Sequence, residues 1–355
     1  MLMAYENGRL VKASDALKTH HYRCCECGEL LVLRKGINKI PHFAHQSNSK
    51  CNSSEGESYV HNLGKFRILH SLPNGTRVEV YLPMIKQRAD VLYHHLAVEY
   101  QCSPITLKRL TERVSGYLSI GITSFWILGM KYYRKRLASP NVLKFLRYHK
   151  NTGFYLIYLN PLTSRYLLRY CICQSDGKYQ YQERTFTKWD TMITFFKSNH
   201  RKEQLHPNLI RVCQRIEYQV RHLDPTMMKL QEYCYYHHSS ITGCPLICHH
   251  YRDLPPVFGK QWLKWVVMII CELKEWVGKR IRQFVSEVYQ KLDFTDHFVF
   301  LVNVKELRMS YINGFLDNLI DRKLLVIEHG IIKQVSDFTW YRDVYAKINV
   351  IKKCS

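Results

Sequence analysis

Between residues 54 and 130, the spacing of apolar residues predicts a helix, three strands, a second helix and a fourth strand. The first helix is predicted from apolar residues three and four positions apart, at Tyr59, Leu63, Phe66 and Leu69. Alternation predicts a strand at 77–82, and two short apolar runs around His94-His95 predict a hairpin at 90–101. Another helix is predicted to open at Pro104, behind Ser103 as N-cap, and a glycine-bounded apolar run at 124–129 fits a buried parallel strand. This order predicts an α+β or α/β core.

The rest of the chain predicts regions on both sides of this core. We expect a small module at residues 1–53, the core at 54–150, an extension at 151–255 and a C-terminal domain at 256–355. In the extension, apolar runs at 154–159 and 166–173 predict a hairpin that joins the core sheet, followed by helices.

The C-terminal domain is predicted to be mainly helical. Residues 262–277 are apolar nearly all round, which predicts a buried helix, with a membrane-surface helix as the alternative. Helices are also predicted at 280–292, 304–307 and 311–321, ahead of a hairpin turn at His329-Gly330. Three helices and a hairpin are typical of a winged helix. Because residues 311–321 contain no cation, a structural or partner-docking role is favoured over reading of DNA.

The charge balance adds a polyanionic partner to this picture. Fifty-two Lys and Arg against 29 Asp and Glu give a net charge of +23, and 25 tyrosines offer surfaces for stacking on bases. We therefore expect DNA as the partner, single-stranded in particular, with a general surface bias or an acidic membrane surface as alternatives. The candidate DNA contacts are Lys65, Arg88, Arg109, Arg113, Lys131, Arg134, Lys135 and Arg136.

Neither a secretory signal nor a membrane-spanning segment is predicted. The first 14 residues lack an apolar core and a cleavage site. The longest apolar run, 265–271, is far shorter than the ~20 residues that a spanning helix needs. Thirteen cysteines without secretion signals predict reduced thiols. We expect a cytoplasmic protein, with any association with the inner face of the membrane made through partners.

The first module contains a candidate zinc site. A Cys3His set of the kind that holds structural zinc is formed by Cys24, Cys27, His45 and Cys51. His42 is the alternative imidazole, and Cys25 is a competing thiol. The other interpretation is reduced thiols beside a packed histidine. Because a module this small has little core, zinc would supply much of its folding free energy.

A second candidate metal motif lies at Cys244-x3-Cys248, in the sequence CPLICHH. No second pair of ligands lies close to it in the sequence. It therefore requires Cys234 or His237-His238 to contribute.

The hairpin at 90–101 contains candidate ligands for a hard cation. Glu99 and Gln101 are two positions apart on one strand, so they share a face, and Asp90 begins the facing strand. Two carboxylates and an amide suit Mg²⁺, or Mn²⁺, because these ions prefer oxygen ligands. The plain alternative is a set of solvated polar positions on a half-buried sheet.

Several short motifs, taken together in this order, resemble the competence protein CoiA family of the PD-(D/E)xK nuclease superfamily. They are CxxC at 24–27, HFAH at 42–45, ESYVH at 57–61, RADVL at 88–92, AVEYQCSPIT at 97–106, the Arg113-x3-Tyr117 helix and WILG at 126–129. The resemblance implies a restriction-endonuclease-like αβββαβ core behind a zinc-knuckle-like module. It also implies metal-binding acids at Asp90 and Glu99, a first-helix acid at Glu57, and Gln101 where most superfamily members have lysine.

The resemblance further implies a DNA-processing factor of natural transformation that cleaves phosphodiester bonds and works with recombination or DNA-uptake proteins. Because Gln101 is neutral, Lys65 or Arg113 is the candidate source of the missing positive charge. One alternative is a non-catalytic DNA-binding adaptor that keeps the nuclease fold. Another is a zinc-based protein-interaction module, which would have no DNA affinity and no steep salt dependence.

Overall fold

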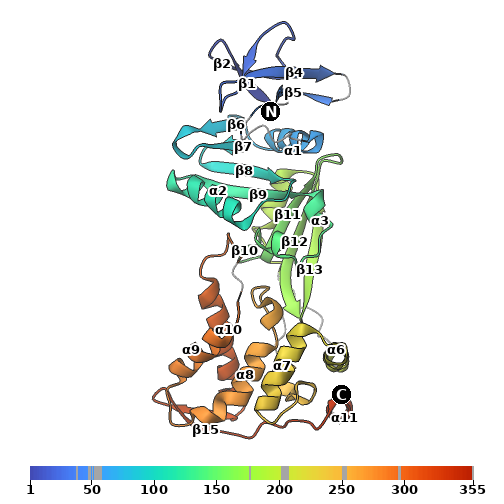
Figure 1. The fold of residues 1–355 in the computed structure, drawn as a ribbon, viewed down its shortest axis with the longest axis vertical. Coiled ribbons are helices and arrows are strands. Elements are labelled where there is room, and N and C mark those ends of the chain that lie inside the picture. Colours follow the sequence, from blue (N-terminus) through green and yellow to red (C-terminus); the bar gives the residue numbers. More distant parts are fainter. Residues whose placement is uncertain are drawn as a thin grey trace. The chain divides into compact units, whose positions relative to one another are not determined.

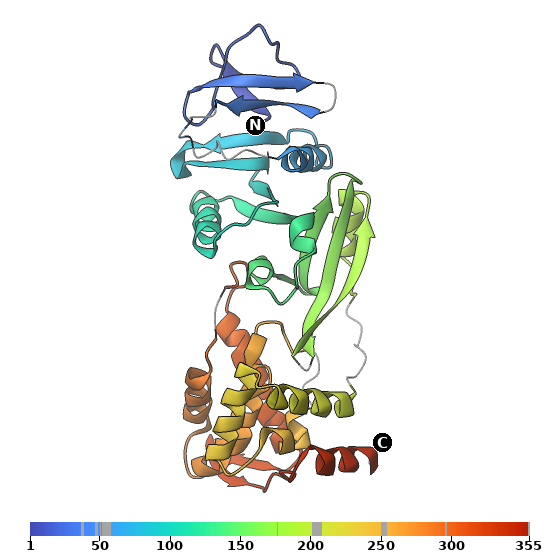
Figure 2. The same ribbon diagram turned by 45° about the vertical axis from the view of Figure 1, so that its right-hand side comes forward.

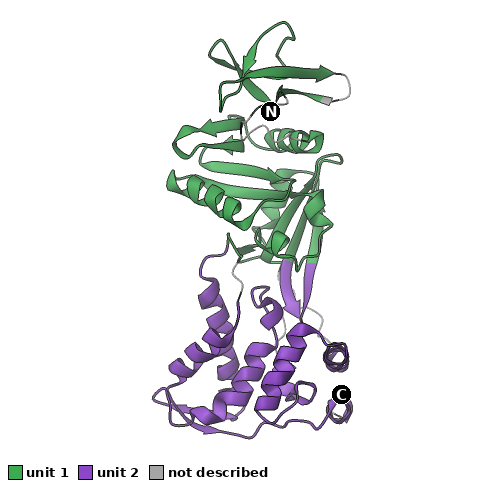
Figure 3. Cartoon of the chain, in the orientation of Figure 1, with its two compact units in different colours: residues 1–170, 182–200, 297–300 green, residues 171–181, 201–296, 301–355 purple. Residues whose placement is uncertain are grey.

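The computed structural model describes residues 1–36, 39–46, 49, 51, 58–175, 177–200, 208–249, 254–294 and 297–353. The chain forms two compact units, coloured separately in Figure 3. The first unit comprises residues 1–170, 182–200 and 297–300, and the second comprises 171–181, 201–296 and 301–355. The architecture is mixed α/β, as predicted. The finer division into four domains stays a prediction.

The first unit begins with a five-stranded antiparallel sheet in the order β2-β1-β3-β4-β5 (Figure 1). Its strands are β1 (Met3–Glu6), β2 (Arg9–Lys12), β3 (Tyr22–Arg23), β4 (Leu30–Gly36) and β5 (Lys39–His45). A small core lies beneath it, where the rings of Tyr22 and Phe43 are 4.7 Å apart and both are buried. Half of the buried residues of this core are small, namely Ala4, Ala13, Ala16 and Cys24.

The main sheet of the first unit has the order β13-β12-β11-β9-β8-β7-β6, with β10 paired to β11. Strands β6, β7 and β8 are antiparallel, whereas β9 is parallel to both β8 and β11. The predicted parallel strand at 124–129 and the predicted sheet extension are therefore confirmed. The strands are β6 (Arg77–Leu82), β7 (Gln87–Tyr93), β8 (Leu96–Gln101), β9 (Thr123–Gly129), β10 (Arg147–His149), β11 (Gly153–Asn160), β12 (Arg165–Ser175) and β13 (Lys178–Phe186).

Two helices flank the strands that carry the predicted site. Helix α1 (Tyr59–Leu69) contacts β6, β7 and β8, and α2 (Leu107–Ser119) contacts β9, as the two views in Figures 1 and 2 show. The Thr106 hydroxyl accepts from Arg109 N at the start of α2, so the helix begins three residues later than the predicted opening at Pro104. Shorter helices in this unit are α3 (Met130–Tyr133), α4 (Pro140–Leu143) and α5 (Trp189–Phe195).

The predicted apolar face of α1 is confirmed at Leu63, which is buried, but is wrong at Tyr59 and Phe66. Tyr59 and Phe66 are 40% and 37% exposed, whereas Gly64 and Lys65 are buried against the sheet. A Cβ on Gly64 would lie 1.9 Å from Cε1 of Tyr100, so the glycine allows the helix to approach the strand closely. The close approach at Gly64 and the ion pair between Lys65 and Glu79 decide which side of α1 faces the sheet.

The second unit is mainly helical. Its core surrounds Trp265, which is fully buried on α8, as predicted for this apolar stretch. The predicted helices at 304–307 and 311–321 are one continuous helix, α10, since neither proline nor glycine lies between them. Arg308, in the joining segment, is buried and donates to the Val257 carbonyl oxygen. The elements are α6 (Leu209–Arg221), α7 (Pro225–Tyr236), the 3-10 turns η3 (Ile241–Gly243) and η4 (Leu246–His249), α8 (Lys264–Glu272), α9 (Ile281–Lys291), α10 (Val304–Asp321), β14 (Leu325–Glu328), β15 (Ile331–Val335) and α11 (Val344–Lys353).

Helices α9 and α10 precede the β14–β15 hairpin, as expected from the sequence. A winged-helix arrangement of these elements stays a prediction. None of the helices formed by the described residues is long and apolar enough to cross a membrane.

Candidate functional site

Three acidic side chains lie on three neighbouring strands of the main sheet. They are Glu79 on β6, Asp90 on β7 and Glu99 on β8, and their exposures are only 2%, 8% and 3%. The strand registers place Asp90 opposite Glu79 on one side and opposite Glu99 on the other. Asp90 and Glu99 were predicted, whereas Glu79 was not. Its position within an alternating strand gave no sign that this acid is buried.

Glu99 is held by two side chains of α2. Arg113 Nη2 donates to Glu99 Oε2 at 2.7 Å, and the Tyr117 hydroxyl donates to Oε1. Burial raises the pKa of Glu99, and the positive charge of Arg113 opposes that rise. Both carboxylate oxygens are thus oriented by the helix that the Arg113-x3-Tyr117 motif forms.

Asp90 is held by the neighbouring strand and by α1. Its Oδ2 accepts from the backbone N of Tyr100 at 2.9 Å and lies 3.4 Å from Nε2 of His61. Burial favours the neutral acid, but His61, together with the cations Lys65 and Arg113, outweighs it and lowers the pKa of Asp90. Asp90 is therefore ionised at neutral pH.

The two predicted acids share one electrostatic environment. The charge of Asp90 raises the pKa of Glu99, and Arg113 lowers the pKa of both. Two buried carboxylates that influence the pKa of each other beside a shared cation are typical of candidate functional sites. The acids of the hairpin are therefore not the solvated surface positions of the plain alternative.

Lys65 and Glu79 form an ion pair in the interior. The side chains are 0% and 1% exposed, and Lys65 Nζ donates to Glu79 Oε1. The other oxygen, Oε2, accepts from the backbone N atoms of Leu2 and Met3, at 2.5 and 3.1 Å. In this position Lys65 does not reach the surface, which disagrees with its predicted role as a DNA contact. It instead adds a positive charge beside Asp90.

The other predicted site residues have different surroundings. Gln101 Nε2 donates to the Ser103 carbonyl oxygen at 2.6 Å, so its amide is turned toward the backbone. Glu57 lies outside the described residues. Of the predicted DNA contacts, those exposed to solvent are Arg109, Lys131, Arg134 and Arg136, and those partly exposed are Arg88, Arg113 and Lys135.

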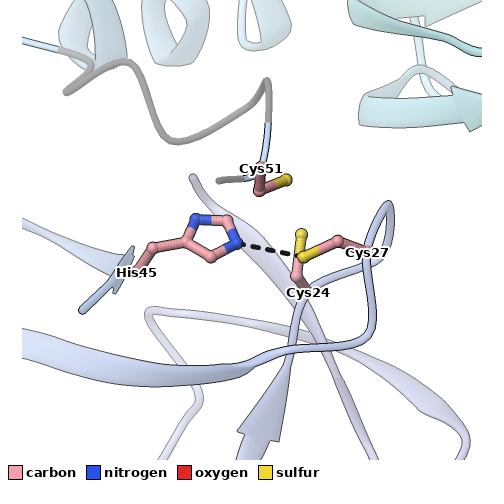
Figure 4. A group of neighbouring side chains, drawn as sticks. All are labelled: Cys24, Cys27, His45 and Cys51. Atoms are coloured by element: carbon pink, nitrogen blue, oxygen red, sulfur yellow. Dashed lines mark hydrogen bonds between the residues drawn. The ribbon is translucent and has the colours of Figure 1, made fainter. Parts of the chain in front are cut away.

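The predicted zinc ligands converge in the first module. The ligand atoms of Cys24, Cys27, His45 and Cys51 all lie within 4.8 Å of one another, and Figure 4 shows them pointing toward a common centre. Cys27 Sγ is 3.3 Å from His45 Nε2. Burial lowers the pKa of His45, which favours the neutral imidazole that binds metals. This Cys3His set fits structural zinc.

The alternative ligands lie elsewhere. His42 Nδ1 is 2.9 Å from the Ile40 carbonyl oxygen and is not part of the cluster, and neither is Cys25. The structure thus groups His45, rather than His42, with the three cysteines. The ligands come from the turn that follows β3, from the end of β5 and from residue 51, so one ion would join separate parts of the module.

Comparison with known proteins gives consistent matches over residues 8–54 and 57–202. Residues 57–202 match the family model described as competence protein CoiA, nuclease-like domain, and residues 8–54 match competence protein CoiA, N-terminal domain. A relative from Bacillus subtilis (strain 168), competence protein CoiA, is 32% identical over 196 residues. That alignment covers 53% of this chain and 48% of the relative, so about half of each is matched. No solved structure matches.

Proposed function

Because the chain belongs to the competence protein CoiA family, we propose that it processes incoming DNA during natural transformation. The proposed chemistry is metal-dependent hydrolysis of phosphodiester bonds by a restriction-endonuclease-like core. The observation that carries the proposal is the buried pair Asp90 and Glu99 on neighbouring strands, with Arg113 close to both. The order α1-β6-β7-β8-α2-β9 is the helix and strand order expected of that core.

The donor set fits Mg²⁺ or Mn²⁺. Mg²⁺ commonly takes one or two protein carboxylates and completes its shell with water and phosphate oxygens, and Asp90 and Glu99 supply two carboxylates. When bound, such an ion supplies a water of lowered pKa and positive charge beside the phosphate. Because Arg113 and Tyr117 hold both oxygens of Glu99, ion binding would compete with these bonds.

The chain's own cations compensate for the missing lysine. Gln101 adds no charge, but Arg113 lies beside Glu99 and Lys65 lies in the interior near Asp90. We propose that the Arg113 side chain moves away from Glu99 and stabilises negative charge on the phosphate. Arg113 can do so because 21% of its side chain is accessible to solvent. Lys65, which is fully buried, would act through Asp90 by keeping that carboxyl ionised.

The solvent-exposed basic residues are proposed to hold the DNA backbone. Arg109 on α2 and Lys131, Arg134 and Arg136 in and after α3 are the candidates. Their contacts to phosphates would make affinity fall steeply with salt. Single-stranded DNA is the proposed substrate, and recombination or DNA-uptake proteins are the proposed partners.

The adaptor function is the second candidate, and a specific observation favours it. Arg113 pairs with Glu99, Lys65 pairs with Glu79 and His61 lies 3.4 Å from Asp90, so each acid already has a partner without an added cation. Such a core would keep the nuclease fold and bind DNA without cutting it. The nuclease requires that the acids can bind a metal ion, whereas the adaptor allows them to stay paired within the protein.

A cleavage assay on single-stranded, duplex and branched DNA tests the proposal. We expect cleavage with Mg²⁺ or Mn²⁺ and its loss in Asp90→Asn and Glu99→Gln, while DNA affinity is retained. The matched control is Glu112→Gln, which removes an exposed acid from the same helix that holds Glu99. Binding without cleavage under both ions would support the adaptor, and absence of both binding and cleavage would refute both candidates.

A further inference from the structure

A buried tryptophan lies beside the guanidinium group of the candidate site. Trp126 is on β9, directly across from Glu99 on β8 in the parallel register of the two strands. It is 4% exposed, and the guanidinium carbon of Arg113 lies over its ring, 5.5 Å from the centroid. A cation within about 6 Å of the ring centroid is attracted to the aromatic face. Trp126 belongs to the WILG motif, but the sequence assigns it no role of its own.

The Arg113 guanidinium is hydrogen-bonded through one nitrogen. Nη2 donates to Glu99 Oε2, to the Arg88 carbonyl oxygen at 3.1 Å and to the Tyr117 hydroxyl oxygen at 3.2 Å. Nε is buried and has no hydrogen-bond partner among the described residues. Bonds to a single nitrogen leave the guanidinium plane able to turn about that nitrogen. Contact with the Trp126 ring restricts this rotation.

The Trp126 ring is itself held in place by its neighbours. Its Nε1 donates to Ser124 Oγ at 3.1 Å. The rings of Phe145 and Phe300 lie 5.8 and 6.3 Å from the Trp126 ring, and the two are stacked on each other. Arg147 lies 4.3 Å over the Phe300 ring and donates to the Ser124 carbonyl oxygen at 2.6 Å. One edge of the indole is therefore fixed by a hydrogen bond, and the ring packs against two others.

Phe300 comes from a distant part of the chain. Residues 297–300 belong to the first unit, whereas α9, which precedes them, and α10, which follows them, belong to the second. A segment between two helices of the second unit thus supplies one of the rings that pack against Trp126.

We propose that Trp126 is a positioning residue, which keeps the Arg113 guanidinium at the site when that side chain moves from Glu99 to a DNA phosphate. This role rests on the nuclease function proposed above. After the move, the bonds of Arg113 to Arg88 and Tyr117 are bonds to uncharged oxygens, so they hold a cation only weakly. An aromatic face attracts the cation without accepting any of its N–H groups as a carboxylate does, so these groups stay available for the phosphate.

The first test observes the guanidinium directly, by nuclear magnetic resonance of the full chain labelled with ¹⁵N-arginine. Protons over an aromatic face resonate upfield, so the Arg113 guanidinium signals, identified by their loss in Arg113→Lys, should move downfield in Trp126→Leu. Trp126→Phe keeps an aromatic face and should preserve most of the upfield shift. The matched control is Trp189→Leu, which removes a buried tryptophan that contacts Phe125 and Tyr166 and should leave the signals in place. Arg113 signals that do not move in Trp126→Leu would overturn the proposal.

If Trp126→Leu does not fold, Phe300→Leu takes its place. Phe300 is half-buried and does not touch Arg113, so its loss should loosen the Trp126 ring and move the Arg113 signals by a smaller amount. Arg113 signals that stay in place in a folded Phe300→Leu would then count against the proposal.

The second test adds a single-stranded oligonucleotide, with Ca²⁺ in place of Mg²⁺ to slow cleavage. The Arg113 signals should shift on addition of DNA to the wild type and shift much less in Trp126→Leu. Equal shifts in both proteins, or no shift in the wild type, would refute the positioning role. If the wild type binds DNA but never cuts it, the nuclease function fails, whereas a shift of the Arg113 signals that depends on Trp126 would still support the contact with phosphate.

Kinetics with Mg²⁺ separate positioning from a general loss of structure. Trp126→Leu should lower kcat for DNA cleavage by about 3- to 10-fold, with KM for DNA and affinity for Mn²⁺ unchanged, and Trp126→Phe should recover most of the rate. An unchanged kcat in Trp126→Leu, or a parallel loss of kcat, DNA affinity and Mn²⁺ affinity, would contradict the proposal.

Discussion

Replacing Lys65 with methionine should destabilise the first unit by about 3 kcal/mol. The ammonium and the Glu79 carboxylate are 0% and 1% exposed, so the change leaves a carboxylate oxygen buried without its cation. Removing one partner of a buried ion pair costs about 3–5 kcal/mol. We expect the lower end, because Glu79 Oε2 keeps its bonds to Leu2 and Met3 N.

Removing both charges should be much less costly than removing one. In Lys65→Met/Glu79→Gln neither charge of this pair is left, so the double variant should lie within about 1 kcal/mol of the wild type. The coupling between the two positions would then be about 2 kcal/mol or more, which a double-mutant cycle measures. Lys131→Met, at an exposed position on α3, should change stability by less than about 0.5 kcal/mol.

Hydrogen exchange read by mass spectrometry is the suitable assay, because a chain with two units need not unfold in one step. Peptides from α1 and β6 should exchange faster in Lys65→Met, and peptides from α10 should not change. The pKa of Asp90 should also rise, since Lys65 lowers it in the wild type. A cost below about 1 kcal/mol, or additive effects of the two substitutions, would refute a buried ion pair at this place.

Three further predictions concern packing, zinc and acid stability. Gly64→Ala should destabilise α1 by about 1–3 kcal/mol, because its Cβ would lie 1.9 Å from the Tyr100 ring. Gly314→Ala in α10, with open space around it, should instead stabilise the helix by about 0.5–1 kcal/mol. Urea unfolding followed by peptide-resolved exchange compares the two variants, and a change in stability of the same sign in both would contradict the close approach. A chelator should release about one zinc from the N-terminal module, Cys24→Ser should not retain that zinc, and metal analysis with circular dichroism checks both. Since the folded-state pKa of Asp90 is lowered, its stabilising contribution is complete at neutral pH and is lost only as pH falls below about 4. Asp90→Asn should remove this part of the acid unfolding transition. Acid unfolding that is unchanged in Asp90→Asn would contradict a lowered pKa of Asp90.

The sequence predicts local arrangements better than buried long-range pairs. The zinc set follows from residue types that bind zinc, although its members are spread over residues 24–51, and the confirmed parallel strand at 124–129 follows from an apolar run bounded by glycine. Strands of two to four residues, such as β1, β2 and β3, are too short to give a period. Strand β13, with its many exposed polar side chains, gives no alternation of apolar residues.

The candidate site shows the same division. Asp90 and Glu99 were predicted because they lie on two strands of one hairpin. Lys65 and Glu79 were misjudged because hydrophobic periodicity treats every lysine as a surface residue. It cannot foresee that an acid 14 positions away will meet the lysine inside the sheet. A buried pair of this kind forms only through tertiary packing, because α1 supplies one charge and β6 supplies the other.

Glu79 connects parts of the chain that fold by different means. One of its oxygens is bonded to α1, and the other is bonded to the backbone next to β1. A zinc ion that stabilises the N-terminal sheet would therefore also stabilise the position of the acid-bearing strands. Loss of zinc should destabilise β6 through the Glu79 carboxylate. The supply of metal in the cell would then determine how well ordered Asp90 and Glu99 are.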